Sequence, residues 1–129
     1  MEEENIVSLW LGTASEVAAL ESALEVSFSE DGDFLGSEFS RKLRIAHYDS
    51  AVTEAEFVPK HADSLRDLLK GVSYSDQILP HFERMVELPS DTNCFVLLYN
   101  FRFSGDPTFK TPSLKLTFVG TCSYKTDHD

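Results

Sequence analysis

The start of the chain has the apolar pattern of a buried strand followed by an amphipathic helix. Residues 5–12 (NIVSLWLG) are nearly all apolar and lie between acidic residues and a glycine, which is typical of a strand inside a sheet. Between Val17 and Leu24 the apolar residues recur at helical spacing, and the glutamates fall on the other side. Thr13 and Glu16 have the spacing of a capping box, so we expect Thr13 to cap this helix.

The middle of the chain predicts a loop and three further helices. Residues 29–36 (SEDGDFLG) consist largely of turn-forming residues. A short helix over 37–43 has a serine in the capping position, and Asp63 is placed to cap the next helix. A third helix begins at Ser75, and we expect Pro80 to bend or restart it.

The last third of the chain alternates between apolar and polar residues, as expected for strands with one buried face. Two such runs, 93–103 and 114–122, are separated by turn-forming residues and therefore predict a long antiparallel hairpin. The segment 45–57 can hold one more short strand. Strand, helices and then a strand pair indicate an α+β fold, a single domain with helices packed on one face of an antiparallel sheet. The residues expected on the buried face of the hairpin are Phe95, Leu97, Tyr99, Phe101, Phe103, Leu114, Leu116, Phe118 and Cys122.

Length and composition agree with this single-domain prediction. A chain of 129 residues is long enough to bury its own core. The ten Phe, four Tyr and one Trp argue against intrinsic disorder. No apolar run approaches the roughly 18 residues that a membrane helix needs, so we expect no membrane span. The first four residues (MEEE) carry acidic rather than basic side chains, which predicts no secretory signal and a cytoplasmic protein.

The net charge of −11 is concentrated at the N-terminal end of the chain. Residues 1–40 hold ten of the 22 acidic residues and no Lys or Arg, whereas residues 41–129 hold the other twelve and all eleven basic residues. Such a field repels phosphate backbones, so direct binding of nucleic acid is disfavoured. It attracts a basic partner and speeds the encounter with it. A solvated, solubilising surface is the alternative explanation of the same charge.

The acidic loop does not match a calcium-binding pattern. Asp31, Asp33 and Gly36 occupy the first, third and sixth positions of an EF-hand loop, but Lys42 stands where the bidentate glutamate is required. The six glycines are scattered and form no phosphate-binding loop. We therefore expect neither a metal site nor a cofactor.

Candidate catalytic groups are few. His47, Asp49 and Glu56 could assemble into the site of a small hydrolase, which would show as a perturbed histidine in a cleft. Cys94 and Cys122 lie in apolar strands and have no neighbouring base. Without an export signal, we expect both to be free, buried thiols with a raised pKa rather than a disulfide.

Short phrases along the chain occur in an order that is similar to that of one protein family. The phrases are Trp10–Gly12 (WLG), Asp31–Asp33 (DGD), Ser37–Phe39 (SEF), Tyr48–Asp49 (YD), Leu69–Ser75 (LKGVSYS), Leu98–Phe101 (LYNF) and Phe118–Gly120 (FVG). In this order and spacing they resemble the immunity protein 22 family of bacterial polymorphic toxin systems. The similarity runs from about Ile6 to Tyr124, and the basic segment Ser40–Arg44 departs from the family pattern.

The resemblance implies a small cytoplasmic α+β protein that binds a cognate toxin domain, often a nuclease, and blocks it in the producing cell or its kin. It implies no catalytic residue. A non-catalytic adaptor without a toxin partner is the alternative. The oligomeric state, and the choice between occlusion of the toxin site and binding beside it, stay open.

The charge asymmetry indicates which residues would meet such a partner. Toxin nucleases tend to be basic because their substrate is polyanionic, and carboxylates can occupy the same surface. Tyr48 and Tyr74 lie in polar surroundings and are further candidates as interface anchors. The acidic candidates are Glu21, Glu25, Glu30, Asp31, Asp33 and Glu38.

Overall fold

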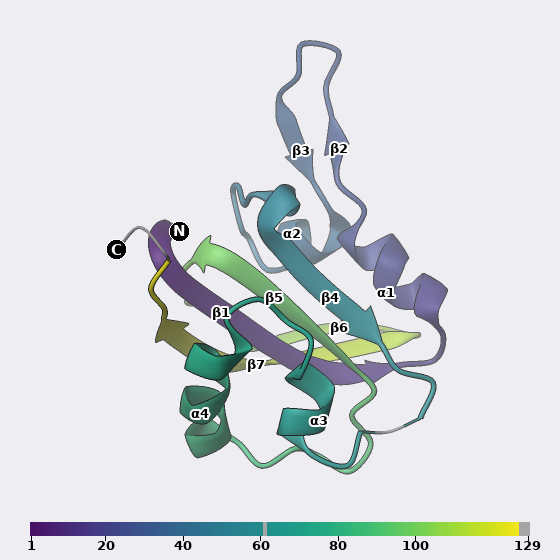
Figure 1. Ribbon diagram of the computed structural model, residues 1–129. Helices are drawn as coiled ribbons and strands as arrows, with labels where there is room; N and C mark the ends of the chain where they lie inside the picture. Colours follow the sequence, from purple (N-terminus) through teal and green to yellow (C-terminus); the bar gives the residue numbers. More distant parts are fainter. Residues whose placement is uncertain (61, 127–129) are drawn as a thin grey trace.

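β1 (Glu2–Ala14) forms the centre of a five-stranded antiparallel sheet (Figure 1). The computed structural model describes residues 1–60 and 62–126. Val7 to Leu11 are all buried, because β1 is paired along both edges and covered on both faces. The predicted buried strand is therefore confirmed. The strands follow one another across the sheet in the order β4 (Thr53–Phe57), β5 (Cys94–Phe101), β1, β7 (Leu114–Ser123) and β6 (Thr108–Thr111).

Helices cover both faces of this sheet (Figure 1). The predicted α+β class with an antiparallel sheet is confirmed, but the expectation that the helices lie on one face is wrong. Both faces of β1 and β5 carry apolar side chains, and each row needs its own cover. One face packs against α1 (Val17–Leu24) and α2 (Glu38–Lys42), and the other against α3 (Leu65–Leu69) and α4 (Ser75–Met85).

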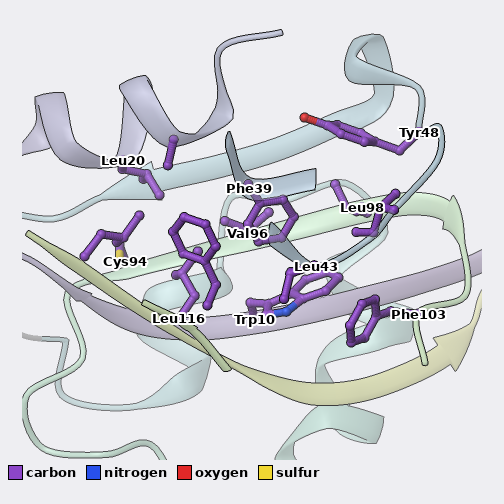
Figure 2. Close-up of a cluster of buried hydrophobic side chains, with 14 of the residues drawn as sticks. Trp10, Leu20, Phe39, Leu43, Tyr48, Cys94, Val96, Leu98, Phe103 and Leu116 are labelled. Atoms are coloured by element: carbon purple, nitrogen blue, oxygen red, sulfur yellow. The ribbon is translucent and has the colours of Figure 1, made fainter. Parts of the chain in front are cut away.

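Alternate side chains of the sheet build two hydrophobic cores. Trp10 lies in the core under α1 and α2, where its ring is 5.1 Å from that of Phe39 and 5.0 Å from that of Phe103 (Figure 2). Leu9, the preceding residue, points to the opposite face and packs with α3 and α4 residues such as Phe82. Period-two alternation along β1 thus serves both cores at once.

The predicted hairpin of β5 with β7 is wrong, because β1 lies between them and pairs with both. β7 forms its hairpin with the short strand β6 instead. β5 is buried on both faces rather than one. β1 is apolar on both faces, so its side chains do not indicate which strands lie beside it. The alternating residues of β5 and β7 likewise do not show that β1 lies between them.

The side chains expected on one face of the hairpin divide between the two cores. Phe95, Leu97 and Tyr99 face α3 and α4, whereas Phe101 and Phe103 face α1 and α2. The reversal occurs at Asn100, whose φ of 58° interrupts the strand. A second irregularity near Gly120 separates Phe118 from Cys122 in the same way. A bulge adds one residue and exchanges the faces that follow it. The alternation of apolar and polar residues in the sequence does not show this exchange of faces.

Helix starts agree only partly with the predicted caps. Thr13 stays within β1 and the N-cap of α1 is Glu16, whose side chain makes no capping hydrogen bond. Ser64, not Asp63, caps α3, and its hydroxyl accepts the N–H of Asp67 at 3.0 Å. Ser37 caps α2 as predicted, in a reciprocal capping box with Ser40.

Candidate partner-binding surface

α1 places two of the acidic candidates beside a groove. Leu20 and Ala23 are buried, so the other side of the helix faces water and carries Glu21. Glu25 follows at the C-terminal end of the helix and is also exposed. Both glutamates line a groove of about 680 Å³ between α1 and β4, whose wall includes Ala55. The groove is therefore apolar on its inner side and acidic on the side that α1 forms.

Three more acidic candidates lie on a hairpin that projects from the body of the protein (Figure 1). The hairpin pairs β2 (Ser27–Phe28) with β3 (Phe34–Gly36). Its turn is closed by the N–H of Gly32, which donates to the carbonyl of Ser29 at 2.9 Å, and Gly32 has a φ of 88° that favours glycine. Glu30, Asp31 and Asp33 are exposed in this turn.

Glu38 opens α2 at the base of the hairpin. Its carboxylate lies 4.0 Å from the Nζ of Lys42, and both side chains are about half exposed. A carboxylate in the first turn of a helix also interacts favourably with the helix dipole. Glu38 is thus the acidic candidate whose charge is partly compensated within the chain.

The other five acidic candidates carry uncompensated charge. In residues 1–60 and 62–126, no ion pair involves these carboxylates. Two cations that follow the hairpin in the chain have other contacts: Arg41 donates to the carbonyl of Leu35 at 3.2 Å, and Lys42 lies 5.6 Å from the ring centre of Phe109. The five are Glu21, Glu25, Glu30, Asp31 and Asp33.

Two large apolar side chains on the hairpin are exposed, and sequence reasoning missed both. Phe28 is 55% exposed and Leu35 is 51% exposed. The Phe28 ring meets the ring of Phe34 edge-on at 5.9 Å, and Phe34 in turn packs on His47 and Tyr48. The hairpin therefore presents apolar groups among its carboxylates, the composition of an interface centre with a polar rim. An apolar residue inside an otherwise polar loop was the available signal.

Tyr48 lies in the core and not on the surface that was expected for it. It is 2% exposed, and its hydroxyl is 3.1 Å from the Oγ of Ser37 (Figure 2). Burial raises the pKa of this phenol. Tyr48 reaches the groove only as part of its wall. The prediction of a surface position rested on the polar residues next to Tyr48 in the sequence, and these do not report its burial.

Tyr74 belongs to the opposite face of the sheet. It precedes α4 in a left-handed conformation with a φ of 59° and packs against Tyr124 at a centroid distance of 4.7 Å. Tyr99 completes this aromatic cluster, and its hydroxyl donates to Glu54 at 2.9 Å. Tyr74 is half-buried there and does not join the hairpin and α1.

Cys94 and Cys122 are free and buried, as predicted. They face different cores, so the sheet itself separates them. Burial raises the pKa of Cys94 to about 12 and that of Cys122 to about 11. Both thiols therefore stay protonated and unreactive at neutral pH.

The three residues of the alternative hydrolase site have separate structural roles. His47 contacts the carboxylate of Glu2 on the surface. Asp49 caps the 3-10 helix Ser50–Val52 by accepting the N–H of Ala51 at 2.9 Å. Glu56 lines a small hollow with Phe95 that neither of the others reaches. These three groups therefore have different partners in the part of the chain that the structure describes.

Comparison with known proteins decides the family. A family model described as Immunity protein 22 matches residues 7–125. The chain belongs to the immunity protein 22 family. No match was found among curated proteins or among solved structures. No helix within residues 1–60 and 62–126 is both long and apolar enough to cross a membrane.

Proposed function

We propose that the chain binds a cognate toxin domain through the surface of α1 and the β2–β3 hairpin and neutralises it. Family membership implies a toxin partner in general. The observation that carries the choice of surface is the joint presence of five uncompensated carboxylates and two exposed apolar side chains on adjoining elements. These seven residues are called the acidic face from here on. They are Glu21, Glu25, Glu30, Asp31, Asp33, Phe28 and Leu35.

The charge of the acidic face selects the partner. Unpaired carboxylates gain most from Lys and Arg side chains that become desolvated together with them, and close pairs of this kind couple by about 1.5–7 kcal/mol. The proposed partner is therefore a basic domain, and a nuclease has the required charge because it binds a polyanion. The same face repels nucleic acid. The chain would therefore compete with nucleic acid for the surface of the toxin and would not bind the nucleic acid itself.

The two apolar residues of the acidic face add hydrophobic contacts, which charge alone does not supply. Phe28 and Leu35 can enter pockets of the partner, and a few residues buried in this way carry most of the binding energy of many interfaces. The surrounding carboxylates then form a rim that steers association. We propose a non-catalytic role in the cytoplasm, with no cofactor. Tyr48 and Tyr74 are not part of the proposed surface, because one is buried and the other lies across the sheet.

The test is capture of a toxin domain followed by charge reversal. The product of the neighbouring gene is co-expressed with the tagged chain, and its toxic activity is assayed with and without the purified chain. Lys substitutions at Glu21, Glu25, Asp31 and Asp33 should weaken binding by at least about a hundredfold and flatten its salt dependence. Unchanged affinity and salt dependence would contradict the acidic face.

A matched control separates the acidic face from net charge. Lys substitutions at four exposed acids elsewhere change the net charge by the same amount, and they should leave affinity within a few-fold of the native value. The positions are Asp63, Asp76, Glu87 and Asp91. Equal losses in both variants would mean that overall charge, not a defined surface, drives binding. Recovery only of a partner without toxic activity would favour the adaptor alternative.

A further inference from the structure

β4 is an edge strand whose outer side is open. It pairs with β5 on one side only. The N–H of Val58 donates to the carbonyl of Asn93 at 2.8 Å, which fixes the direction of the backbone groups at this end of β4. Because these groups alternate along a strand, the N–H and C=O of Ala55 and Phe57 point away from β5. Among the residues that the structure describes, nothing pairs with them.

The opposite edge of the sheet is less open. This edge is formed by β6. The Nζ of Lys42 donates to the carbonyl of Lys110 at 3.2 Å and occupies part of this edge. A lysine on an edge is a usual protection against unwanted pairing. β4 therefore offers the better place for an added strand.

Two hollows flank β4 on the two faces of the sheet. The groove of about 680 Å³ beside α1 includes Thr53 and Ala55 in its wall. A smaller hollow of about 240 Å³, which includes Glu56 and Val72, lies towards the α3 side. Successive side chains of a strand point to opposite faces. An added strand would therefore place alternate side chains in the two hollows, as in known strand-addition complexes.

The charge around β4 selects the occupant. Glu21 and Glu25 line the first hollow and Glu56 the second, and no Lys or Arg is among the described residues lining either one. Pairing of β4 with β4 of a second copy would bring these carboxylates together, and like charges facing each other across strands are destabilising. An extended segment with Lys or Arg side chains would meet them favourably.

We propose that β4 accepts an extended, basic segment of the toxin domain as a sixth strand of the sheet. The added strand pairs with the outward groups of Ala55 and Phe57, and its basic side chains reach Glu21, Glu25 and Glu56. This inference rests on the proposed function for the identity of the partner. It extends the acidic face from α1 onto the neighbouring sheet edge.

The first test uses the isotope-labelled chain and a synthetic peptide with a repeating Lys-Lys-Val-Val sequence, which presents lysine on both faces of an added strand. Amide exchange is followed by NMR. The exchange of the Ala55 and Phe57 amides should slow on addition of the peptide, while the same peptide with glutamate for lysine should have no effect. Binding elsewhere, or no binding, would overturn the proposal. If these two amides exchange more slowly as the protein concentration is raised without peptide, β4 pairs with a second copy of the chain instead.

The second test removes one outward N–H. Ala55→Pro eliminates a donor that the β4–β5 pairing does not use, and proline is tolerated in edge strands at such positions. Ala55→Gly keeps the N–H and is the matched control. The proline variant should bind the peptide on the order of tenfold more weakly, since the outward hydrogen bonds are lost. Equal binding by the two variants would overturn the proposal.

The toxin assay then separates this inference from the proposed function. If the native chain and Ala55→Pro neutralise the captured toxin equally well, strand addition is wrong and the acidic face stands. If the native chain does not neutralise the toxin, the proposed function is wrong, and the peptide experiment still decides whether β4 receives a basic strand. Loss of neutralisation in Ala55→Pro but not in Ala55→Gly supports both.

Discussion

The backbone N–H of Asn5 donates to the Oδ1 of Asn100 at 2.9 Å, and both residues have left-handed backbone conformations. The two asparagines face each other across β1 and β5, where the register of the pair shifts. Oδ1 of Asn100 also accepts the hydroxyl of Tyr124 at 2.8 Å. Asparagine tolerates the left-handed region better than most residues. This site thus sets the point at which the faces of β5 exchange.

Asn100→Ala should lower the free energy of unfolding by about 2–4 kcal/mol, because it loses two hydrogen bonds and replaces asparagine with a residue that tolerates the left-handed conformation less well. Asn100→Gly loses the same two hydrogen bonds, but glycine is unstrained in this conformation. It should therefore lower the free energy of unfolding by less. Urea denaturation of both variants measures the difference. Equal stability of the native chain and Asn100→Ala would show that Asn100 does not stabilise the bulge.

Phe28 and Leu35 should contribute to binding and little to folding. Phe28→Ala should weaken toxin binding by roughly tenfold or more, as expected for an aromatic anchor, while the melting temperature stays within about 2 °C. Phe34→Ala is the contrasting variant, because Phe34 joins the hairpin to His47 and Tyr48. It should reduce stability as well as binding. Native affinity in Phe28→Ala and Leu35→Ala would exclude the apolar part of the acidic face.

Gly12 lies in β1 at a position that leaves no room for a side chain beside β7. A β-carbon at this position would lie 1.9 Å from the carbonyl oxygen of Lys115, so the two strands would have to separate. Gly12→Ala should cost at least about 2 kcal/mol of stability. Gly71→Ala is the control, since a β-carbon there meets nothing within 4 Å. Thermal unfolding of both variants tests this, and similar melting temperatures would contradict the close packing of β1 and β7.

Stability should fall at alkaline pH. Burial raises the pKa of Cys94 from 9.0 to about 12 and that of Cys122 from 9.0 to about 11. The unfolded chain therefore releases these protons before the folded chain does. The stabilisation is complete below pH 9. It is lost as the pH rises from 9 through the folded pKa values, by about 1.4 kcal/mol per pH unit for each thiol that is ionised in the unfolded chain and still protonated in the folded chain.

Urea denaturation between pH 7 and pH 11 measures this loss. In a variant with alanine at both cysteines the decline should begin nearer pH 10, where the buried phenol of Tyr48 starts to contribute. Tyr99 has a raised pKa for the same reason, with Glu54 adding to the effect of burial. An unchanged pH profile in the double variant would mean that the thiols do not set the onset.

Local pattern was sufficient for several elements of the fold and for the charge of the candidate surface. The apolar run of β1, the serine cap of α2 and the leucine stripe of α3 depend on neighbours within a few residues, so the sequence predicts them correctly. The concentration of acidic residues before position 41 is a property of composition alone. The order of short phrases was likewise sufficient to indicate the family.

Long-range packing decided the rest. β1 separates β5 from β7 because strand pairing joins residues far apart in the chain, and an apolar strand has no local mark of its neighbours. Burial of Tyr48 depends on its contact with Ser37 and the wall of the groove, not on its sequence neighbours. The gathering of the hairpin, α1 and the open edge of β4 on one side also required the fold. The sequence by itself determined the charge and the local elements, and the tertiary structure decided which of these elements meet, because side-chain burial and strand pairing are set by residues distant in sequence.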